Sequence, residues 1–466
     1  MSFTKNDLKK ISDYLWEIPK DYRSDMRVPA RVFANEKLLD ELFKDRSLEQ
    51  LVNVATLPGI QKWALSMPDI HEGYGFPIGG VAAMDAETGV ISPGGIGYDI
   101  NCSVTLLRSP VTYEEIKDKI SQLSDEIYKQ VPSGVGRGGR VRLSTDEFNS
   151  VLKDGAPRMI EAGYGFEEDL EHRESKGRLE DTEPSLVSKT AKDRGRDQLG
   201  TIGAGNHFVE VQRVDEIFDK ETARSLGLFP GQVVIMFHCG SRGLGHQVAT
   251  DYIRVMMRAL PKYGITLADP ELACAPFKSA EGSSYWQAMS AAANFGFANH
   301  QMITWEVRQA WEKVFGKDSG SQLSVVYQVA HNLAKLEEHF DKKVIVHRKG
   351  ATRAFPDQPV LIPGSMGTAS YVLVGVQGAM ELSFGSSCHG AGRMMSRTRA
   401  KREVRGSVLK QDLEKQGIAV RSGSMSGLAE EAPVAYKDVE AVVEAVDGAG
   451  LAKKVARLRP VAVIKG

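Results

Sequence analysis

Apolar residues recur along the chain at two spacings, one typical of helices and the other of strands. Helical spacing predicts helices at residues 5–18, 35–51, 112–131 and 251–322. The first of these has four large apolar residues on one face, namely Leu8, Ile11, Leu15 and Trp16. Short apolar runs predict strands at residues 103–107, 207–211, 233–237, 323–329, 344–346 and 359–362.

The order of these elements shows no regular alternation of strand and helix. Several predicted strands run directly into glycine-rich turns, and the helices come in blocks between them. This order favours the α+β class over a parallel α/β fold. We therefore predict one large α+β domain over residues 1–466, with residues 112–197 as an inserted helical and charged subregion.

The 46 glycines are gathered in a few clusters, several of them at the ends of predicted strands. The cluster at residues 67–80 also contains two prolines, Asp69, His71 and Glu72. Because proline and glycine interrupt both helices and central strands, this segment is predicted to be a binding loop. An ordinary polar turn is the alternative.

Composition and charge describe a globular protein without a general affinity for polyanions. Hydrophobic residues make up 42% of the chain and charged residues 26%. The 59 Lys and Arg residues balance the 60 Asp and Glu residues, so a nucleic-acid site would have to be a local patch. The first ten residues contain no apolar signal core, and no stretch reaches the ~18 apolar residues of a membrane span. We expect a soluble, cytoplasmic protein that binds no membrane.

Candidate metal ligands share one setting, at a strand end or in a glycine-rich turn. They are Asp99, Cys102, His207, His238, His331, His347 and His389. Any one of them alone is more often a packed core residue, but so many in the same setting predict a common cleft. Structural zinc sites use closely paired ligands, so donors spread along the chain favour a catalytic metal centre. The four cysteines form no disulfide framework.

His389 lies in the stretch Ser383–Arg393, where two glycines follow it and a run of helical character begins at Arg393. Backbone N–H groups at such a turn could bind a phosphate, and a neutral imidazole could attack phosphorus or bind a metal. A turn histidine without chemistry is the alternative. Three basic segments, residues 132–140, 192–196 and 393–405, could contact nucleic acid or be solvated surface.

The glycine-rich motifs resemble those of the RtcB family of RNA ligases. The matching segments are PGGIGYDINC, GAGNHF, GSRGLGHQ, HRKGATRAFP, PGSMGTASY and SCHGAGR. The resemblance extends from Arg27 to Gly466, essentially the whole chain. It implies a fold with mixed β-sheets around a central metal cleft and with peripheral helices.

The resemblance also implies the roles of individual residues. Two Mn²⁺ ions would be bound, one by Cys102, His207 and His238 and the other by Asp99, Cys102 and His331. His389 would be the catalytic residue that is guanylylated. The GTP site would comprise Asn206, His207, Phe208, Val209, Glu210, His331, Asn332, Pro363, Gly364, Ser365, Met366, Ser370, His389, Gly390, Ala391, Gly392 and Lys465. Arg242, Arg353 and Arg393 are candidate phosphate-binding residues.

The implied activity joins RNA 2',3'-cyclic phosphate or 3'-phosphate ends to 5'-hydroxyl ends, through a histidine–GMP and an RNA-3'-ppG intermediate. The expected partners are GTP and RNA, either tRNA halves or broken strands, together with an archease-type activating protein. The protein is expected to be a monomer or a weak oligomer. A binuclear phosphoesterase without a covalent nucleotide is the alternative, and a non-catalytic RNA-binding protein is a third reading. Residue chemistry alone favours zinc, so manganese follows from the resemblance.

Two positions differ from the pattern that the resemblance leads us to expect. Cys239 stands where a small hydroxyl residue is expected, and its thiol could add an unwanted ligand or an oxidation-prone group. The loop after Phe355 is short, because Asp357 and Gln358 lead almost at once into the next predicted strand.

Overall fold

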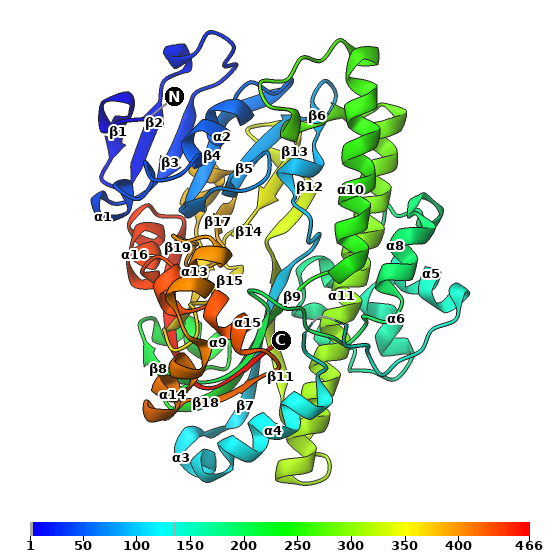
Figure 1. Ribbon diagram of the computed structural model, residues 1–466, viewed down its shortest axis with the longest axis vertical. Helices are drawn as coiled ribbons and strands as arrows, with labels where there is room; N and C mark the ends of the chain where they lie inside the picture. Colours follow the sequence, from blue (N-terminus) through cyan, green and yellow to red (C-terminus); the bar gives the residue numbers. More distant parts are fainter. Residues whose placement is uncertain (1–2, 135) are drawn as a thin grey trace.

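The computed structural model describes residues 3–134 and 136–466. Met1 and Ser2 lie outside the described residues, as does Val135 of the basic segment 132–140. Two large β-sheets are stacked along the long axis of the molecule, and helices cover their outer sides (Figure 1). Strands and helices are mixed along the chain, which confirms the predicted α+β class.

The upper sheet in Figure 1 has seven strands in the order β1-β2-β3-β4-β5-β13-β12. Their bounds are β1 Lys9–Ser12, β2 Leu15–Ile18, β3 Ala30–Phe33, β4 Ile60–His71, β5 Ile78–Asp85, β13 Lys342–Lys349 and β12 Asn332–His339. All neighbours are antiparallel except β3 and β4. Its apolar face packs against α2 and α16 in one large core.

The lower sheet has the order β11-β7-β9-β8-β19-β16-β15, with β18 parallel to β19. Its strands are β11 Ser324–Ala330, β7 Ser103–Thr112, β9 Gln232–Cys239, β8 Phe208–Ile217, β19 Ala452–Lys465, β16 Ser370–Gly375, β15 Pro359–Ile362 and β18 Ala419–Ser422. Two short pairs complete the strands, β6 Val90–Ile91 with β10 Ala275–Pro276, and β14 Ala351–Arg353 with β17 Ser386–Cys388.

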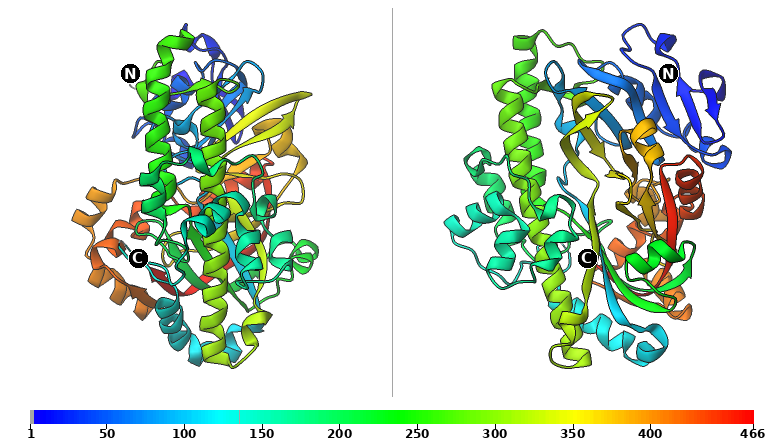
Figure 2. Two further views of the ribbon diagram at one scale, coloured as in Figure 1. Left: turned by 90° about the vertical axis from the view of Figure 1, so that its right-hand side faces the viewer. Right: turned by 180° about the vertical axis from the view of Figure 1, so that it is seen from behind.

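The helix α11, Ala280–Phe315, spans both sheets (Figure 1). Its 36 residues correspond to about 54 Å of helix, and almost every side chain between Tyr285 and Val314 is buried. Small residues near its first half permit close packing with α10, and both views of Figure 2 show the two helices side by side. Its second half packs against β8, β9 and α4.

The remaining helices lie around this framework. They are α1 Glu36–Leu39, α2 Ser47–Val54, α3 Tyr113–Ile116, α4 Ile120–Gln130, α5 Thr145–Asp154, α6 Ala156–Glu161, α7 Glu168–Glu171, α8 Lys189–Gly195, α9 Lys220–Ser225, α10 Arg242–Ala259, α12 Gln377–Ser383, α13 Arg397–Glu403, α14 Gly406–Lys415, α15 Met425–Glu430 and α16 Val439–Gly448. Helices α4, α5 and α6 pack on α11, and α8 packs on α10. The division of the chain into one domain with an insertion at 112–197 stays a prediction.

The prediction of a helix at residues 5–18 is wrong. A short 3-10 helix, Lys5–Asp7, is followed by the hairpin of β1 and β2. Trp16 is buried in β2 and its indole N–H donates to the carbonyl of Ala34, 3.0 Å away. Pairing with β3 therefore determines the conformation, while Ile11 remains exposed instead of lying on a buried helix face.

The loop predicted at residues 67–80 is also wrong over part of its length. Strand β4 continues through Pro68 and Asp69 to His71, and only residues 72–77 connect it to β5. The register with β5 shifts between Ser66 and His71, so the proline occupies an irregular part of the ladder. This irregular strand end places Asp69 in the site described below.

Residues 167–197 belong to the predicted charged subregion, but three of their charged side chains, Asp169, Arg173 and Glu174, are buried. Asp169 forms a two-pronged ion pair with Arg308 of α11, with both nitrogen–oxygen distances at 2.7 Å. Glu174 pairs with the buried Lys335 at 2.5 Å. The charges on this segment therefore anchor it to the core.

Among the helices in the described ranges, none is both long and apolar enough to cross a membrane.

Candidate active site

Four strands of the lower sheet end at the same edge, and their ends carry four of the predicted ligands. His238 of β9 lies opposite Val104 of β7 and Phe208 of β8 in the two antiparallel ladders. Cys102 and His207 precede those strands and so lie beside His238. The backbone N–H of His331, at the end of β11, donates to the carbonyl of Cys102, 2.9 Å away.

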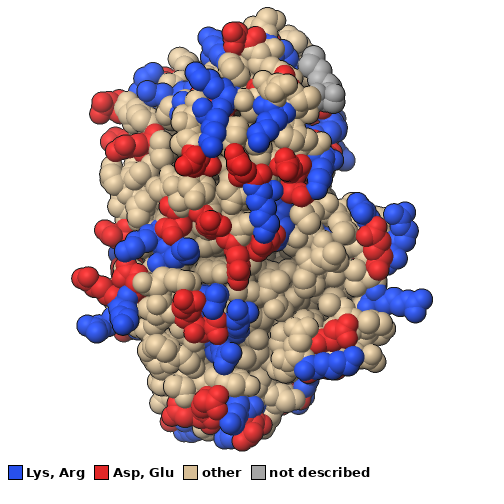
Figure 3. Space-filling model, turned by 90° about the vertical axis from the view of Figure 1, so that its left-hand side faces the viewer, with Lys and Arg blue, Asp and Glu red and all other residues tan. Residues whose placement is uncertain are grey.

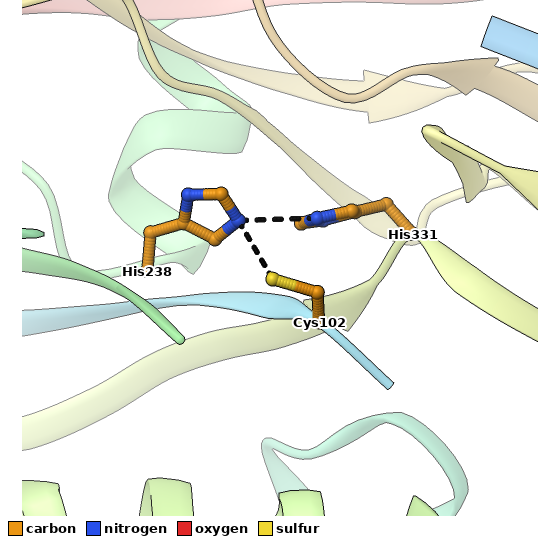
Figure 4. Close-up of side chains that lie close together, drawn as sticks. All are labelled: Cys102, His238 and His331. Carbon is orange, nitrogen blue, oxygen red and sulfur yellow. Dashed lines mark hydrogen bonds between the residues drawn. The ribbon is translucent and has the colours of Figure 1, made fainter. Parts of the chain in front are cut away.

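The ligand atoms of these residues meet in one buried cluster (Figure 4). Nε2 of His238 lies 3.1 Å from Sγ of Cys102 and 3.1 Å from Nε2 of His331. Nε2 of His207 lies 2.9 Å from a carboxylate oxygen of Asp99 and 3.4 Å from the Cys102 sulfur. All five predicted metal ligands are therefore within reach of a common centre.

The cluster divides into two groups of three that could each hold an ion. Cys102, His238 and His331 form one, and Asp99, Cys102 and His207 form the other. This division differs from the one that the resemblance implies, which places His207 with His238 and Asp99 with His331. Cys102 belongs to both groups in either division, because its thiol lies close to both His207 and His238.

Burial and mutual contacts determine the protonation of the cluster. Burial raises the pKa of the Cys102 thiol, and the charge of Asp99 adds to this effect. Burial also opposes ionisation of Asp99, but the hydrogen bond with His207 and the charges of His207, His246 and Arg242 together outweigh it and lower the pKa of this carboxyl. Burial lowers the pKa of His238. A neutral His238 can donate its Nδ1–H to the carbonyl of Asn206, 3.1 Å away, which leaves the Nε2 lone pair facing the cluster.

His389 lies next to this cluster, after β17. Its ring centroid is 4.8 Å from that of His331, and Nδ1 lies 2.6 Å from a carboxylate oxygen of Asp69. The same oxygen accepts the backbone N–H of His389 at 3.2 Å. The Asp69 side chain is fully buried, so this contact fixes the orientation of the imidazole.

A cavity of about 580 Å³ contains the cluster and His389. This volume lies within the range of nucleotide-sized ligand sites. All residues of the predicted GTP site line the cavity except Val209 and Ser370. Val209 packs in the core between the sheet and α11, and the Ser370 hydroxyl accepts a hydrogen bond from the backbone N–H of Gly364 at 3.2 Å.

Two oppositely charged groups face the cavity away from the cluster. Burial raises the pKa of Glu210 to about 7, although a hydrogen bond from Gln212 and the charge of Lys465 act against it. Burial lowers the pKa of Lys465, whose ammonium donates to the carbonyl of Gly205 at 2.8 Å. The cavity therefore offers both an acceptor and a cation to a polar ligand.

Three predictions about this region are corrected by the structure. His347 lies within β13, where its ring accepts the backbone N–H of Ser92 at 3.2 Å, and it does not line the cavity. Arg353 is bonded to Gln358 and lies outside the cavity, whereas Arg242 and Arg393 line it. The helix expected from Arg393 begins only at Arg397, so His389 does not precede a helix.

Cys239 faces away from the ligand cluster. Its thiol donates to the carbonyl of Thr201 at 3.2 Å and lies 3.8 Å from Nδ1 of His207. Because that nitrogen is on the far side of the His207 ring from Asp99 and Cys102, the thiol contacts a candidate ligand without joining the cluster.

The basic run 393–405 is largely paired with acidic neighbours. Arg399 pairs with Glu403, Lys401 with Glu430, and Arg393 with Glu431. Lys and Arg side chains are likewise interspersed with Asp and Glu over the face shown in Figure 3. The Arg399–Glu403 pair is typical of a solvated surface, whereas Glu431 is buried and its partner Arg393 lines the cavity together with Arg397.

Sequence analysis did not assign several residues of the site. Asp69 was noted only as part of a polar segment, and its partner His389 is 320 positions away in the chain. The cavity is also lined by His71, Tyr74, Tyr98, His246 and Lys349. All five lie in or beside the glycine-rich segments, and this setting was the signal available for these side chains.

Comparisons with known proteins give one consistent result. A family model described as tRNA-splicing ligase RtcB matches residues 50–466. A tRNA-splicing ligase RtcB of Thermococcus kodakarensis is 55% identical, with 98% of this chain and 99% of the relative aligned. The proteins of the same name from Archaeoglobus fulgidus and Pyrobaculum aerophilum are 54% and 51% identical over the same shares.

Proposed function

The chain belongs to the RtcB family of tRNA-splicing ligases, and from this premise we propose that it joins RNA ends with a 2',3'-cyclic phosphate or 3'-phosphate to RNA ends with a 5'-hydroxyl. It is an RNA ligase, and GTP and two Mn²⁺ ions are its cofactors. The reaction serves tRNA splicing or RNA repair. The observation that carries the proposal is the position of His389, whose ring lies beside the candidate metal cluster.

The donor set fits a pair of metal ions. Its five residues bring one carboxylate, one thiol and three imidazoles together in a buried site, where uncompensated charges would be costly. Because Cys102 belongs to both groups of three, its thiolate would be a ligand of both ions. Thiolate and imidazole are softer ligands than manganese usually takes, so the choice of manganese follows from the family. When bound, the ions would supply Lewis acidity that neutralises phosphate oxygens.

Asp69 prepares His389 to act as a nucleophile. By accepting the Nδ1–H, its carboxylate holds the imidazole in the tautomer with a free lone pair on Nε2. The same contact stabilises the positive charge that the ring gains when Nε2 forms a bond to phosphorus. This arrangement has the nucleophile and its orienting group in direct contact.

Glu210 and Lys465, the acidic and the basic group on the other side of the cavity, suit a guanine nucleotide. The carboxylate of Glu210 can accept the two parallel N–H donors of the guanine edge. The backbone turns at Pro363–Met366 and Gly390–Gly392 border the same space as Lys465. We assign this part of the cavity to GTP, so that its α-phosphate lies near His389.

The steps follow from these positions. Nε2 of His389 attacks the α-phosphorus of GTP, an N–P bond forms, the bond to the β-phosphate breaks and pyrophosphate leaves. A cyclic phosphate is first opened by water to a 3'-phosphate. An oxygen of this 3'-phosphate then takes the GMP from His389, giving RNA-3'-ppG and the free imidazole. The 5'-hydroxyl finally attacks the RNA 3'-phosphorus, releasing GMP and forming the phosphodiester.

We also expect an archease-type protein to activate the enzyme, which would work in the cytoplasm as a monomer or weak oligomer. A binuclear phosphoesterase could use the same metal ligands, but it would give His389 and Lys465 no role.

Radiolabelled GTP tests the proposal. After incubation with MnCl₂, the denatured protein should retain label on an acid-labile bond, and His389→Ala should retain none. His172→Ala is the matched control, because His172 is exposed and lies outside the cavity. Label that persists in His389→Ala would remove this residue from the nucleophilic role, and release of phosphate without labelling would favour the phosphoesterase.

A further inference from the structure

Lys437 is a buried cation next to the segment that carries Asp69. It lies just before α16, only 6% of its surface is exposed, and it is not among the residues that line the cavity. Its ammonium donates to the carbonyls of Pro68 and Ile70, 3.3 and 2.5 Å away. Because these two residues flank Asp69 in the chain, the ammonium lies against the backbone that carries the carboxylate.

The segment around Asp69 depends on side chains for its hydrogen bonds. The pairing of β4 with β5 shifts between Ser66 and His71, where the proline interrupts the ladder. Buried carbonyls need donors, and the ammonium of Lys437 supplies two of them. The Nδ1–H of His71 donates to the carbonyl of Asp69 itself, 2.8 Å away. Side-chain donors therefore hold three successive carbonyls at this strand end.

The backbone of Lys437 contacts the turn that carries His389. Its N–H donates to the carbonyl of Gly392, 2.9 Å away. Gly392 has a φ of +77°, and a Cβ atom at this position would lie 2.2 Å from the carbonyl oxygen of Asp69. Only glycine permits so close an approach in this conformation. Lys437 thus holds both segments, with its side chain on that of Asp69 and its main chain on that of His389.

Lys437 also balances the charge of the Asp69 carboxylate. One carboxylate oxygen accepts both hydrogen bonds from His389, and the other has no hydrogen-bond partner within the described part of the chain. A buried carboxylate is costly unless a cation compensates its charge. Burial lowers the pKa of Lys437 to about 8, and the charge of Asp69 is the largest effect that opposes this shift. The ammonium and the carboxylate therefore stabilise each other in their charged forms.

We infer that Lys437 is a positioning residue for the nucleophile, and that it holds the Asp69 carboxylate against Nδ1 of His389. Because it lies outside the cavity, it acts through Asp69 and not on GTP directly. Without the ammonium, the carbonyls beside Asp69 lose their donors, and the contact of 2.6 Å with His389 is no longer fixed. Displacement of an orienting group slows the chemical step and leaves ground-state binding intact. This inference rests on the proposed function and adds a residue to its first step.

Lys437→Met tests the inference, because it keeps the length of the side chain and removes the ammonium. The rate of guanylylation at saturating GTP should fall by about 10- to 100-fold, the size of effect for a misplacement of about 1 Å. The Kd of a GTP analogue that cannot transfer its nucleotide should stay the same. Lys335→Met is the matched control, because Lys335 is similarly buried but its ammonium bonds Glu174 and Ser175. It should lose thermal stability and keep the guanylylation rate of its folded fraction.

A double-mutant cycle with Asp69→Asn shows whether Lys437 acts through Asp69. Lys437→Met should slow the unmodified protein but have little further effect on the Asp69→Asn variant. Equal factors in both backgrounds, or an unchanged rate in Lys437→Met, would overturn the inference. If Lys437→Met does not fold, Lys437→Gln, which keeps an N–H donor but no charge, is measured in the same cycle.

A proton resonance of His389 provides a readout that requires no GTP. With isotope-labelled histidine, the Nδ1–H that donates to Asp69 should give a slowly exchanging signal, which His389→Ala identifies by its loss. This proton should exchange faster in Lys437→Met and remain protected in Lys335→Met, and equal protection in the two variants would contradict the inference. Absence of GTP labelling in the unmodified protein, together with a signal that depends on Lys437, would contradict the proposed function and leave the positioning role standing.

Discussion

At the residue scale, the buried carboxylate of Asp69 orients the imidazole of His389, the proposed nucleophile. Asp69→Asn keeps the size of the side chain but removes the charge that orients the imidazole and stabilises its cationic form. We expect the rate of guanylylation to fall by about 10²–10⁴-fold, as for other carboxylate–histidine pairs. Quench-flow labelling with GTP measures this rate. Bound manganese, measured by elemental analysis, should stay at the level of the unmodified protein, and an unchanged rate would show that Asp69 is only structural.

Glu210 should make GTP binding at the proposed nucleotide site depend on pH. Its pKa of about 7 in the free protein means that the side chain becomes neutral as the pH falls below 7. In the proposed site the carboxylate would accept the guanine N–H groups, so GTP affinity should decrease by up to about tenfold per pH unit below 7. Titration with a GTP analogue that cannot transfer its nucleotide measures this dependence. Glu210→Gln should bind weakly with a flat profile between pH 5.5 and 8, and a dependence that persists in this variant would assign it to another group.

The candidate ligands could be predicted from the sequence because several of them share the same local sequence pattern. Asp99, Cys102, His207, His238 and His331 share strand ends and glycine-rich turns, and the structure brings them together. His347 has the same sequence setting, but it faces Ser92 within its strand and not the cavity. The Asp69–His389 pair could not be predicted, because no local pattern relates two residues 320 positions apart.

At the element scale, α11 carries polar side chains that tie separate loops together. Asn299 accepts the backbone N–H groups of Gly200 and Thr201 at 2.7 and 3.2 Å, and it donates to the carbonyl of Gly240 at 3.1 Å. These are the turns that lead to His207 and follow His238. A buried side chain on one helix thus fixes the spacing of two candidate ligands.

Asn299→Ala should therefore weaken metal binding by about 10–100-fold, the range for groups that orient ligands. Isothermal titration of the metal-free protein with MnCl₂ measures this affinity. Asn294→Ala is the matched control on the same helix, because Asn294 is equally buried but bonds the distant Leu179 and Lys153. Both variants should lose thermal stability. Equal metal affinities in the two would limit Asn299 to a general structural role.

Element prediction succeeded where the apolar pattern was long or fully buried. The strand predicted at 359–362 matches β15, and the buried runs before His238 and His331 lie in β9 and β11. The pattern failed at residues 5–18, where two four-residue strands form a hairpin and the second pairs with β3. It failed again at Pro68, because an irregular strand admits a proline that a regular one excludes.

At the scale of the whole molecule, the metal cluster joins distant parts of the chain, so its occupancy should affect global stability. The donors lie at or near the ends of β11, β7, β9 and β8, and a bound cation would compensate the charge of the buried Asp99 carboxylate and stabilise the folded chain. Chelation should lower the melting temperature measured by calorimetry, and added MnCl₂ should restore it. Cys102→Ala should bind no metal and gain no stability from it.

Cys239→Ser is the matched control for this experiment, because its side chain lies outside the cluster. It should keep the response to MnCl₂. A Cys102→Ala variant with unaltered metal content would contradict the bridging assignment. Loss of the response in Cys239→Ser would instead place Cys239 among the ligands.

The balance of charge over the whole surface limits how RNA can be held. Positive and negative side chains alternate on the face in Figure 3, and the net charge is -1. RNA affinity should therefore arise inside the cavity and at its rim, where Arg194, Arg242 and Arg397 lie. Few phosphate contacts imply a shallow dependence of RNA binding on salt.

Mass spectrometry of the protein after incubation with MnCl₂ and GTP tests the central claim most directly. The account predicts one GMP per chain, on the peptide that contains His389 and lost on mild acid treatment. No adduct, or an adduct on another residue in the unmodified protein, would contradict the claim that His389 beside the metal cluster carries the nucleotide.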